Sequence, residues 1–303
     1  MLRVFSLALV ALTMCYGQVS AQVALQVRFA PGTKSTSETD VKTHQILTLA
    51  GMDVETRSST FSITTKSIGE RAADGTLPIQ EKIDVLQTEV GLPGGTTLQF
   101  DSSNPEKKAG NPLLEPLLER LRVSFQNPVT VLLDDKNKIK EIKFPEGVVE
   151  SLDASNKSLF DPVKRKKAAE QARGYLPDEP VKPGESWERA TEADFGGGQT
   201  MSFRTKYTYV GTVEIDGQMF DKITGNVFEV SYSVDQAAPI RVAKSDLKVT
   251  ESNETVLFDR GLGAVQQLQR KLRIEGPLTL VINGTNLDGK LDLTIEEKTK
   301  RQK

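Results

Sequence analysis

The residue types that most often carry out enzyme chemistry are scarce in this chain. His44 is the only histidine and Cys15 the only cysteine. A serine hydrolase triad would have to use His44, and the sequence has no Gly-x-Ser-x-Gly nucleophile motif. The strand neighbours that share its phase, Lys42 and Thr48, are polar, so we expect His44 to face solvent. Zinc and iron sites built from histidine and cysteine are excluded by number.

Carboxylates are plentiful, with 41 Asp and Glu, but no pair stands out at the spacing that a hydrolase would use. The most calcium-like stretch is Asn286–Gly289. On the EF-hand template it would place Gly284 and Ile295 at the two essential ligand positions, and neither side chain binds calcium. We therefore interpret this stretch as a polar hairpin turn and predict no metal, no cofactor and no catalytic residue.

The N-terminus carries the pattern of an export signal. Arg3 precedes an apolar run, and an Ala-x-Ala-like site ends at Ala21, which predicts a signal peptide over residues 1–21. The apolar run is too short to span a bilayer, and no comparable stretch follows. An alternative would attach lipid at Cys15, but Met14 stands where that motif needs a small residue. We expect a protein exported to the periplasm or beyond, cleaved after Ala21, with no transmembrane segment.

The remaining composition is that of a globular protein of 303 residues, with 26% charged and 37% hydrophobic residues. Removal of Arg3 with the signal peptide leaves 38 basic against 41 acidic residues, a formal charge of −3. Nucleic-acid binding requires a basic surface, so we expect no nucleic-acid partner. Loss of Cys15 also leaves no disulfide and no thiol nucleophile.

The first half of the chain combines strands and helices. Alternation over residues 23–29 predicts a first strand, and the Thr- and Ser-rich stretch 33–65 predicts two long antiparallel strands with one face in water. Residues 112–125 form a helix pattern with Asn111 as N-cap, and residues 161–174 form a second one capped by Asp161. We expect the leucine stripe of the first helix to pack on the sheet, with a mobile lid as the alternative.

The stretch Leu176–Trp187, reading LPDEPVKPGESW, is a stiff connector with three prolines and the only tryptophan. Beyond it, period-2 alternation predicts an antiparallel meander with a two-residue turn at Asp216-Gly217. A change of phase predicts a bulge at Gly225-Asn226, and Pro277 predicts an edge or a bulge in a late strand.

Aromatic and large apolar side chains share one face of this meander. They are Met201, Phe203, Tyr207, Tyr209, Phe228 and Tyr232. On a strongly curved sheet such a face lines a site for a lipid or another hydrophobe. On a flatter sheet the same face is core, which is the commoner case, and both interpretations stay open.

Three features together resemble an uncharacterised family of secreted bacterial proteins that is common in planctomycete-type organisms. They are the export signal, the connector around Pro180–Trp187 and the step Phe258-Asp259-Arg260-Gly261 before the last strands. The resemblance covers most of the second half and implies no catalytic residue. Its layout is similar to the half-barrels of periplasmic lipoprotein and lipid carriers, which is an analogy of fold alone.

We therefore expect a β-rich α+β protein, a long curved antiparallel sheet with two helices packed on one face. Residues 22–175 would form a first half and residues 176–303 a second. The first functional hypothesis is a non-catalytic envelope protein that binds a lipid or another hydrophobic ligand. The second is a structural or interaction protein that contacts a protein or polysaccharide of the envelope. The third is a hydrolase that uses carboxylates.

Overall fold

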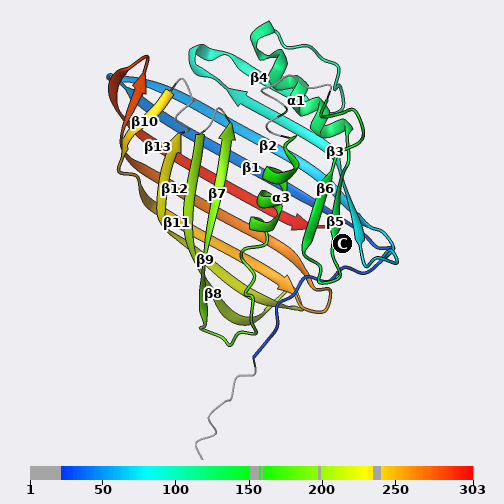
Figure 1. Ribbon diagram of the computed structural model, residues 1–303. Coiled ribbons are helices and arrows are strands. Elements are labelled where there is room, and N and C mark those ends of the chain that lie inside the picture. Colours follow the sequence, from blue (N-terminus) through cyan, green and yellow to red (C-terminus); the bar gives the residue numbers. More distant parts are fainter. Residues whose placement is uncertain (1–21, 151–156, 158–159, 197–198, 235–239, 303) are drawn as a thin grey trace, which may run out of the picture.

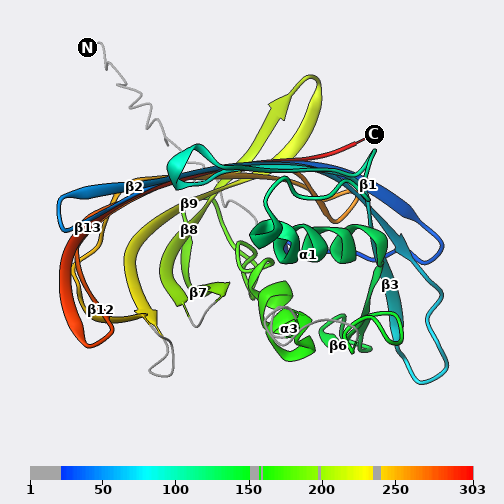
Figure 2. The same cartoon turned by 90° about the horizontal axis from the view of Figure 1, so that it is seen from above.

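The computed structural model of the protein describes residues 22–150, 157, 160–196, 199–234 and 240–302. The expected signal peptide, residues 1–21, lies outside this range. In the described part of the chain, thirteen strands form one antiparallel sheet (Figure 1). The sheet is curved and open, and its helices lie on the concave side (Figure 2). The expected fold class is confirmed.

The elements follow the order of the chain. The first half contains β1 (Lys34–Leu49), β2 (Met52–Ile68), β3 (Leu77–Gly91), β4 (Thr97–Asp101), α1 (Glu115–Gln126), β5 (Val129–Leu133), β6 (Ile139–Lys143) and α3 (Pro162–Gln171). The second half contains β7 (Ser186–Gly196), β8 (Gln199–Ile215), β9 (Gln218–Val234), β10 (Ile240–Ser245), β11 (Lys248–Asp259), β12 (Ala264–Ile282) and β13 (Thr285–Arg301).

The strand order is β6-β5-β3-β2-β1-β13-β12-β11-β9-β8-β7, with β4 beside β3 and β10 beside β12. The first and last long strands meet in the middle, where β1 pairs with β13 from Ser37 opposite Arg301 to Leu49 opposite Gly289. Strands of the two predicted halves are thus joined by one continuous ladder. The division of the chain at residue 175 stays a prediction.

The predicted strand over residues 23–29 is wrong. Only Val23 pairs, in an isolated bridge with Val181 of the connector. The segment instead crosses to the second half, where Leu25 is buried in a cluster with Tyr209 and Phe258. Its alternating pattern reflects side chains that pack on the sheet rather than a ladder of backbone hydrogen bonds, and both arrangements produce the same period in the sequence.

Tight turns connect the long hairpins. Asp216 and Gly217 both have positive φ, and Ile215 pairs with Gln218, which confirms the predicted turn. The last hairpin turns at Asn283-Gly284, again with positive φ at both residues. The predicted turn at Asn286–Gly289 is therefore wrong, because these residues already belong to β13.

Both helices cover the concave face. Asn111 caps a short 3-10 turn by accepting from the Leu113 amide at 3.0 Å, and α1 follows. Its Leu118 is buried against Leu86 of β3 and Phe100 of β4. Helix α3 lies between β6 and β7, at the two ends of the strand order, and contacts both (Figure 2). Helix α1 thus packs on the sheet through its apolar stripe, as the sequence predicted, and α3 is the polar helix capped by Asp161.

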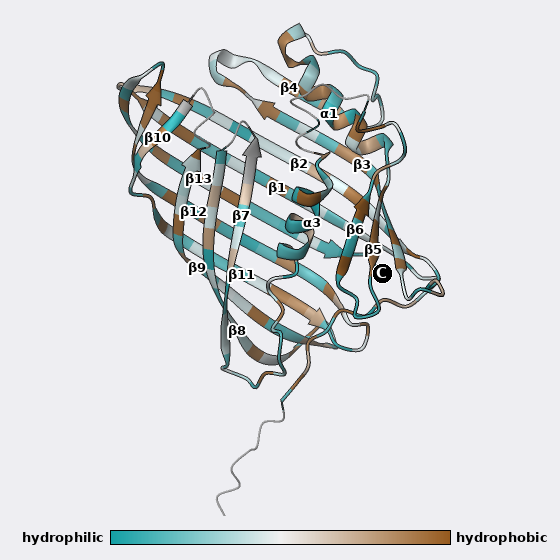
Figure 3. Ribbon diagram, viewed as in Figure 1, coloured by the Kyte–Doolittle hydropathy of each residue, from teal (hydrophilic) through white to brown (hydrophobic). Residues whose placement is uncertain are grey.

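Along most strands, apolar and polar residues alternate, so that one set faces the concave side (Figure 3). In β9 the phase changes at a bulge between Val227 and Glu229, which leaves Phe228 unpaired. The sequence predicted this bulge at Gly225-Asn226, two residues too early. Pro277 pairs with Lys290 on one side and lies at the junction of β10 and β11 on the other, as its missing N–H requires.

One lateral row of paired residues crosses the concave face. From β7 to β3 it runs through Trp187, Tyr207, Gly225, Glu254, Arg270, Glu297, Val41, Thr60 and Thr88. We call this set the central row. Its glycine is required by space, because a Cβ on Gly225 would lie 2.8 Å from Cε1 of Tyr207 and 3.1 Å from Cβ of Glu254.

We predict that Gly225→Ala lowers the free energy of unfolding by about 1–3 kcal/mol, since the added methyl group displaces the Tyr207 ring. Urea denaturation followed by circular dichroism measures the change. The matched control is Gly91→Ala, also in a strand, where the nearest atom to a new Cβ is 3.9 Å away. Equal stability of Gly225→Ala and the wild type would contradict the packing described here.

Candidate functional site

The structure separates the six residues that the sequence predicted as one hydrophobic face. Met201, Phe203 and Tyr232 belong to one apolar cluster, and Tyr207 and Tyr209 belong to a second. Met201 and Tyr209 are only 2% and 1% exposed. Phe228 lies apart from both clusters because of the bulge in β9, and it is 44% exposed with the Arg204 guanidinium 5.0 Å from its ring centre.

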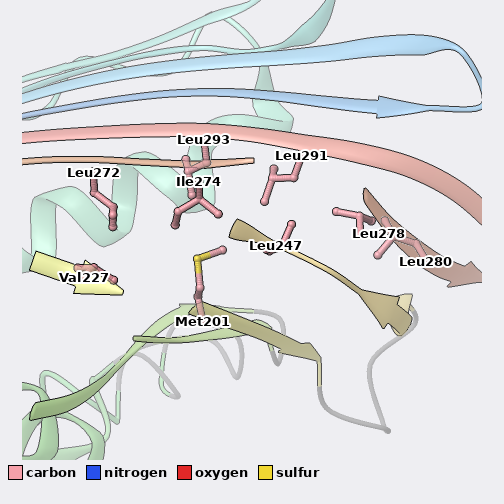
Figure 4. Close-up of a cluster of buried hydrophobic side chains, with 9 residues drawn as sticks. All are labelled: Met201, Val227, Leu247, Leu272, Ile274, Leu278, Leu280, Leu291 and Leu293. Atoms are coloured by element: carbon pink, nitrogen blue, oxygen red, sulfur yellow. The ribbon is translucent and has the colours of Figure 1, made fainter. Parts of the chain in front are cut away.

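The first cluster forms where the sheet divides. Strand β9 pairs with β11 only between Asp221 and Gly225. Strand β11 stays beside β12 as far as Lys248 opposite Glu275, and β10 then takes its place from Ser245 opposite Leu278. The two branches then face each other across an apolar layer (Figure 4). This layer contains Met201, Val227, Leu247, Leu272, Ile274, Leu278, Leu280, Leu291 and Leu293. We call it the apolar layer.

Half-buried hydrophobic side chains pack around the apolar layer, and we call them the apolar rim. They are Leu47, Leu49, Phe203, Val230, Tyr232, Val242, Val249, Ile282 and Ile295. They come from both branches of the divided sheet. Because part of each side chain still contacts solvent, these residues offer apolar surface to a ligand, which the fully buried members do not.

The second cluster is structural. The Tyr209 hydroxyl donates to Oδ1 of Asp221 at 2.7 Å, and Nε of Arg260 donates to Oδ2 at 2.9 Å. Asp221 is 2% exposed, and these two partners satisfy both oxygens of its buried carboxyl group. The hydrogen bond to Asp221 raises the pKa of Arg260 above its ordinary value, although burial opposes the shift. The Phe258–Gly261 step of the sequence thus fixes β11 to β9, and Tyr209 serves this contact.

A partly buried group of charges occupies the middle of the central row. Arg270 lies between Glu254 and Glu297 and donates a hydrogen bond to Glu297. Glu254 is 4% exposed, and burial raises the pKa of its carboxyl, an effect that Arg270 opposes. Burial alone would lower the pKa of Arg270, but the carboxylates of Glu297 and Glu254 raise it. We call these three residues the Glu-Arg-Glu triad.

The aromatic end of the row adjoins the triad. Trp187 stacks on Tyr207 with ring centres 6.0 Å apart, and Gly225 leaves room for Tyr207 to reach Glu254. Burial raises the pKa of the Tyr207 hydroxyl well above its usual range. The Trp187 Nε1 atom is buried and has no hydrogen-bond partner among the described residues. Such an orphan donor is rare in folded proteins.

The other end of the row is polar and uncharged. The Thr60 and Thr88 hydroxyls lie 3.2 Å apart, and in an adjoining row Thr39 and Thr299 lie 3.0 Å apart. The half-buried hydroxyl groups on this part of the concave face belong to Thr39, Thr43, Ser58, Thr60, Ser62, Thr88 and Thr299. We call them the hydroxyl patch.

The sequence prediction missed the triad, although a signal exists. Arg270 shares its strand phase with Leu268, Leu272 and Ile274, and Glu297 follows Leu291, Leu293 and Ile295 in the same way. A charge that interrupts the apolar phase of neighbouring strands indicates a buried polar contact. Only the register shows that these interruptions meet in one row.

The convex side of the sheet carries a lone histidine and two depressions. His44 is half-exposed and contacts Oε1 of Glu55 at 2.6 Å, as expected for a side chain that faces outward. Two depressions of about 340 and 600 Å³ lie mainly over outward-facing side chains of β1, β2 and β13, among them Asp40 and Lys298.

Among the described residues, no group of three or more His, Cys, Asp or Glu is placed to hold a metal ion. No helix in this range is long and apolar enough to cross a membrane.

Comparison with known proteins adds little about function. No family model matches the chain, and no curated protein matches it either. Lipovitellin, in a structure concerned with lipid–protein interactions, is similar over 91% of this chain with 13% identity and a TM-score of 0.40. The chain spans about a quarter of lipovitellin, 26%.

Two bacterial structures are more distant. A protein with a YmcC-like fold from Bacteroides fragilis covers 89% of this chain, and 98% of its own, with 8% identity and a TM-score of 0.20. A DUF1329 family protein from Desulfovibrio piger covers 88%, and 84% of its own, with 8% identity and a TM-score of 0.15. Likenesses at this level carry no argument about function, and the resemblance to a secreted family stays a prediction.

Glu254 predicts a pH dependence of stability. Its folded pKa lies above the ordinary value of 4.5, so the native state holds a proton that the unfolded state releases as the pH rises through this window. Stability contributed by the protonated form is therefore lost with rising pH. We predict that Glu254→Gln flattens this decline, which is at most about 1.4 kcal/mol per pH unit for one proton.

Urea denaturation between pH 4.5 and pH 8 measures the slope for both proteins. Glu251→Gln is the control, because this residue is on the same strand, its side chain is 44% exposed, and it pairs with Lys271. We expect that variant to keep the slope of the wild type. An identical slope in Glu254→Gln and wild type would show that Glu254 is ionised in both states over this range.

Proposed function

We propose that this protein is an exported, non-catalytic binding protein that holds a hydrophobic or amphipathic ligand on the concave face of its sheet. One observation carries the proposal. Where the sheet divides, its two branches enclose the apolar layer, and the apolar rim around that layer stays half-exposed. A rim supplied from both branches can contact an alkyl chain on two sides.

The driving force would be ordinary burial of apolar surface. Each 100 Å² of rim and ligand surface removed from water contributes about 2.5 kcal/mol before the costs of binding are subtracted. Phe203 and Tyr232 would supply contacts from β8 and β9, and Val242 from β10. Met201, Tyr207 and Tyr209 support these elements from within the core and would not themselves contact ligand.

The other parts of the proposal rest on the sequence. The expected signal peptide supports export, and the lack of a second histidine or cysteine supports a protein without common catalytic groups. A carboxylate hydrolase is not part of this proposal and stays a prediction from the sequence, because the proposal rests on the apolar layer and its rim.

We predict that the uncharged fluorophore N-phenyl-1-naphthylamine binds the purified protein, residues 22–303, saturably and with increased fluorescence. Phe203→Ala should weaken binding about tenfold, which corresponds to about 1.4 kcal/mol of lost apolar contact. Val242→Thr, which places a hydroxyl group in the apolar rim with little change of shape, should also weaken binding of the fluorophore.

Phe228→Ala is the matched control, since it removes the same side chain from a neighbouring strand outside the apolar rim. Thermal denaturation and near-ultraviolet circular dichroism show whether each variant keeps the native packing. Binding by Phe228→Ala should equal that of the wild type. Absence of saturable binding, or an equal loss in the two phenylalanine variants, would refute the proposed site.

A further inference from the structure

We infer that the central row recognises the polar head group of the ligand, and that this head group is uncharged and rich in hydroxyl groups, such as a sugar. This inference rests on the proposed function and adds the class of ligand to it. The site would comprise Arg270 and Glu297 of the Glu-Arg-Glu triad, Trp187 and the hydroxyl patch, with Glu254 and Tyr207 as buried supports.

The position of the row supports this assignment. The adjoining row contains Val227 and Leu272 of the apolar layer and Ile295 of the rim. At the point where the sheet divides, the Val227 amide donates to Oγ of Ser252 at 2.7 Å. The apolar layer therefore begins one row away from the triad. A ligand with its chain along the rim would place its polar end at the central row.

The charge of the triad selects among head groups. The Arg270 guanidinium is already paired with the Glu297 carboxylate, so a head group that carries a carboxylate, sulfate or phosphate would meet a site without excess positive charge. The side chain of Arg270 is 40% exposed and that of Glu297 is 21% exposed, so both remain within reach of a ligand. A guanidinium only donates hydrogen bonds, and a carboxylate only accepts them.

Hydroxyl groups satisfy both kinds of partner, because each one donates and accepts. A sugar presents several of them at fixed spacing and can therefore bind Arg270 and Glu297 together. The hydroxyl patch extends the same chemistry over β1, β2 and β3, where Thr60 and Thr88 are half-buried and uncharged. This surface favours a polyhydroxylated head group over a single ammonium ion.

Trp187 adds an aromatic surface at the end of the row. Its Nε1 atom is buried, but the residue as a whole is half-buried, and the ring stacks on Tyr207 beside the triad. Aromatic rings pack on the apolar faces of sugars, so the exposed part of the Trp187 ring would contact such a head group.

The test keeps the chain constant and varies the head group. Dodecyl maltoside, dodecanoate and dodecyltrimethylammonium are each titrated below their micelle concentrations into residues 22–303, and fluorescence of Trp187, the only tryptophan, is measured. We expect the maltoside to bind at least tenfold more tightly than either charged amphiphile. Glu297→Gln should weaken maltoside binding about tenfold, and Thr60→Val about threefold to fivefold.

Thr65→Val is the matched control, because Thr65 lies on β2 but faces the other side of the sheet, 3.1 Å from the Thr36 hydroxyl. It should bind the maltoside like the wild type. Displacement of N-phenyl-1-naphthylamine by each amphiphile provides a second readout that does not depend on Trp187. Circular dichroism confirms that each variant is folded.

Each other outcome has one meaning. Equal affinity for the three amphiphiles would overturn the inference while the proposed function stands, because only the chain would then be recognised. Tightest binding of dodecyltrimethylammonium would overturn it in favour of a cation site, and tightest binding of dodecanoate would overturn it in favour of Arg270 as an anion site. Failure of all three amphiphiles and of the naphthylamine would overturn both proposals.

Discussion

The ladder between β1 and β13 is the constraint on which the rest of the fold depends. It joins residues near the start of the described chain to residues at its end, from Ser37 opposite Arg301 to Leu49 opposite Gly289. Without it, the strands of the first half and those of the second would be two separate sheets with four edges. With it, the concave face becomes one surface, and rows of side chains run across nearly the whole molecule.

The function that we propose depends on a local exception to this regular ladder. Continuous pairing would cover both sides of β9 and would leave no apolar surface between branches. The sheet divides beyond Gly225, where β9 leaves β11, and further along β12 the strand β10 replaces β11. Gly276 permits this exchange, because a Cβ there would lie 2.2 Å from the Asp246 carbonyl oxygen of the β10–β11 junction. The apolar layer and its half-exposed rim are the consequence.

The central row shows how charge is tolerated beside that layer. Arg270 is flanked by two glutamates on the neighbouring strands, and burial of Glu254 is offset by the guanidinium and by Tyr207. Ionic groups in such surroundings stabilise a fold weakly, because their desolvation cancels much of the attraction between them. Their value would lie in ligand specificity, because they separate two regions of the concave face, the apolar layer and the hydroxyl patch.

Local patterns in the sequence predicted much of the architecture. The caps at Asn111 and Asp161 begin their helical segments as expected, and the turn at Asp216-Gly217 has the expected geometry. Errors arose where one local pattern is compatible with two structures. Residues 23–29 alternate like a strand but pack as an extended segment, and Asn286–Gly289 is a turn-like stretch inside β13. Phe228 shares a phase with Val230 and Tyr232 but is separated from them by a bulge.

The strand periodicity, the capped helices, the tight turns and the scarcity of histidine and cysteine follow from the amino-acid sequence, because they depend on residues near one another or on composition. Which strands are neighbours, where the sheet divides and which side chains meet follow from long-range pairing. Glu254, Arg270 and Glu297 lie on three different strands and form a triad only because the register aligns them. Register is set by the sum of many pairings along a ladder, and no single stretch of sequence contains that sum.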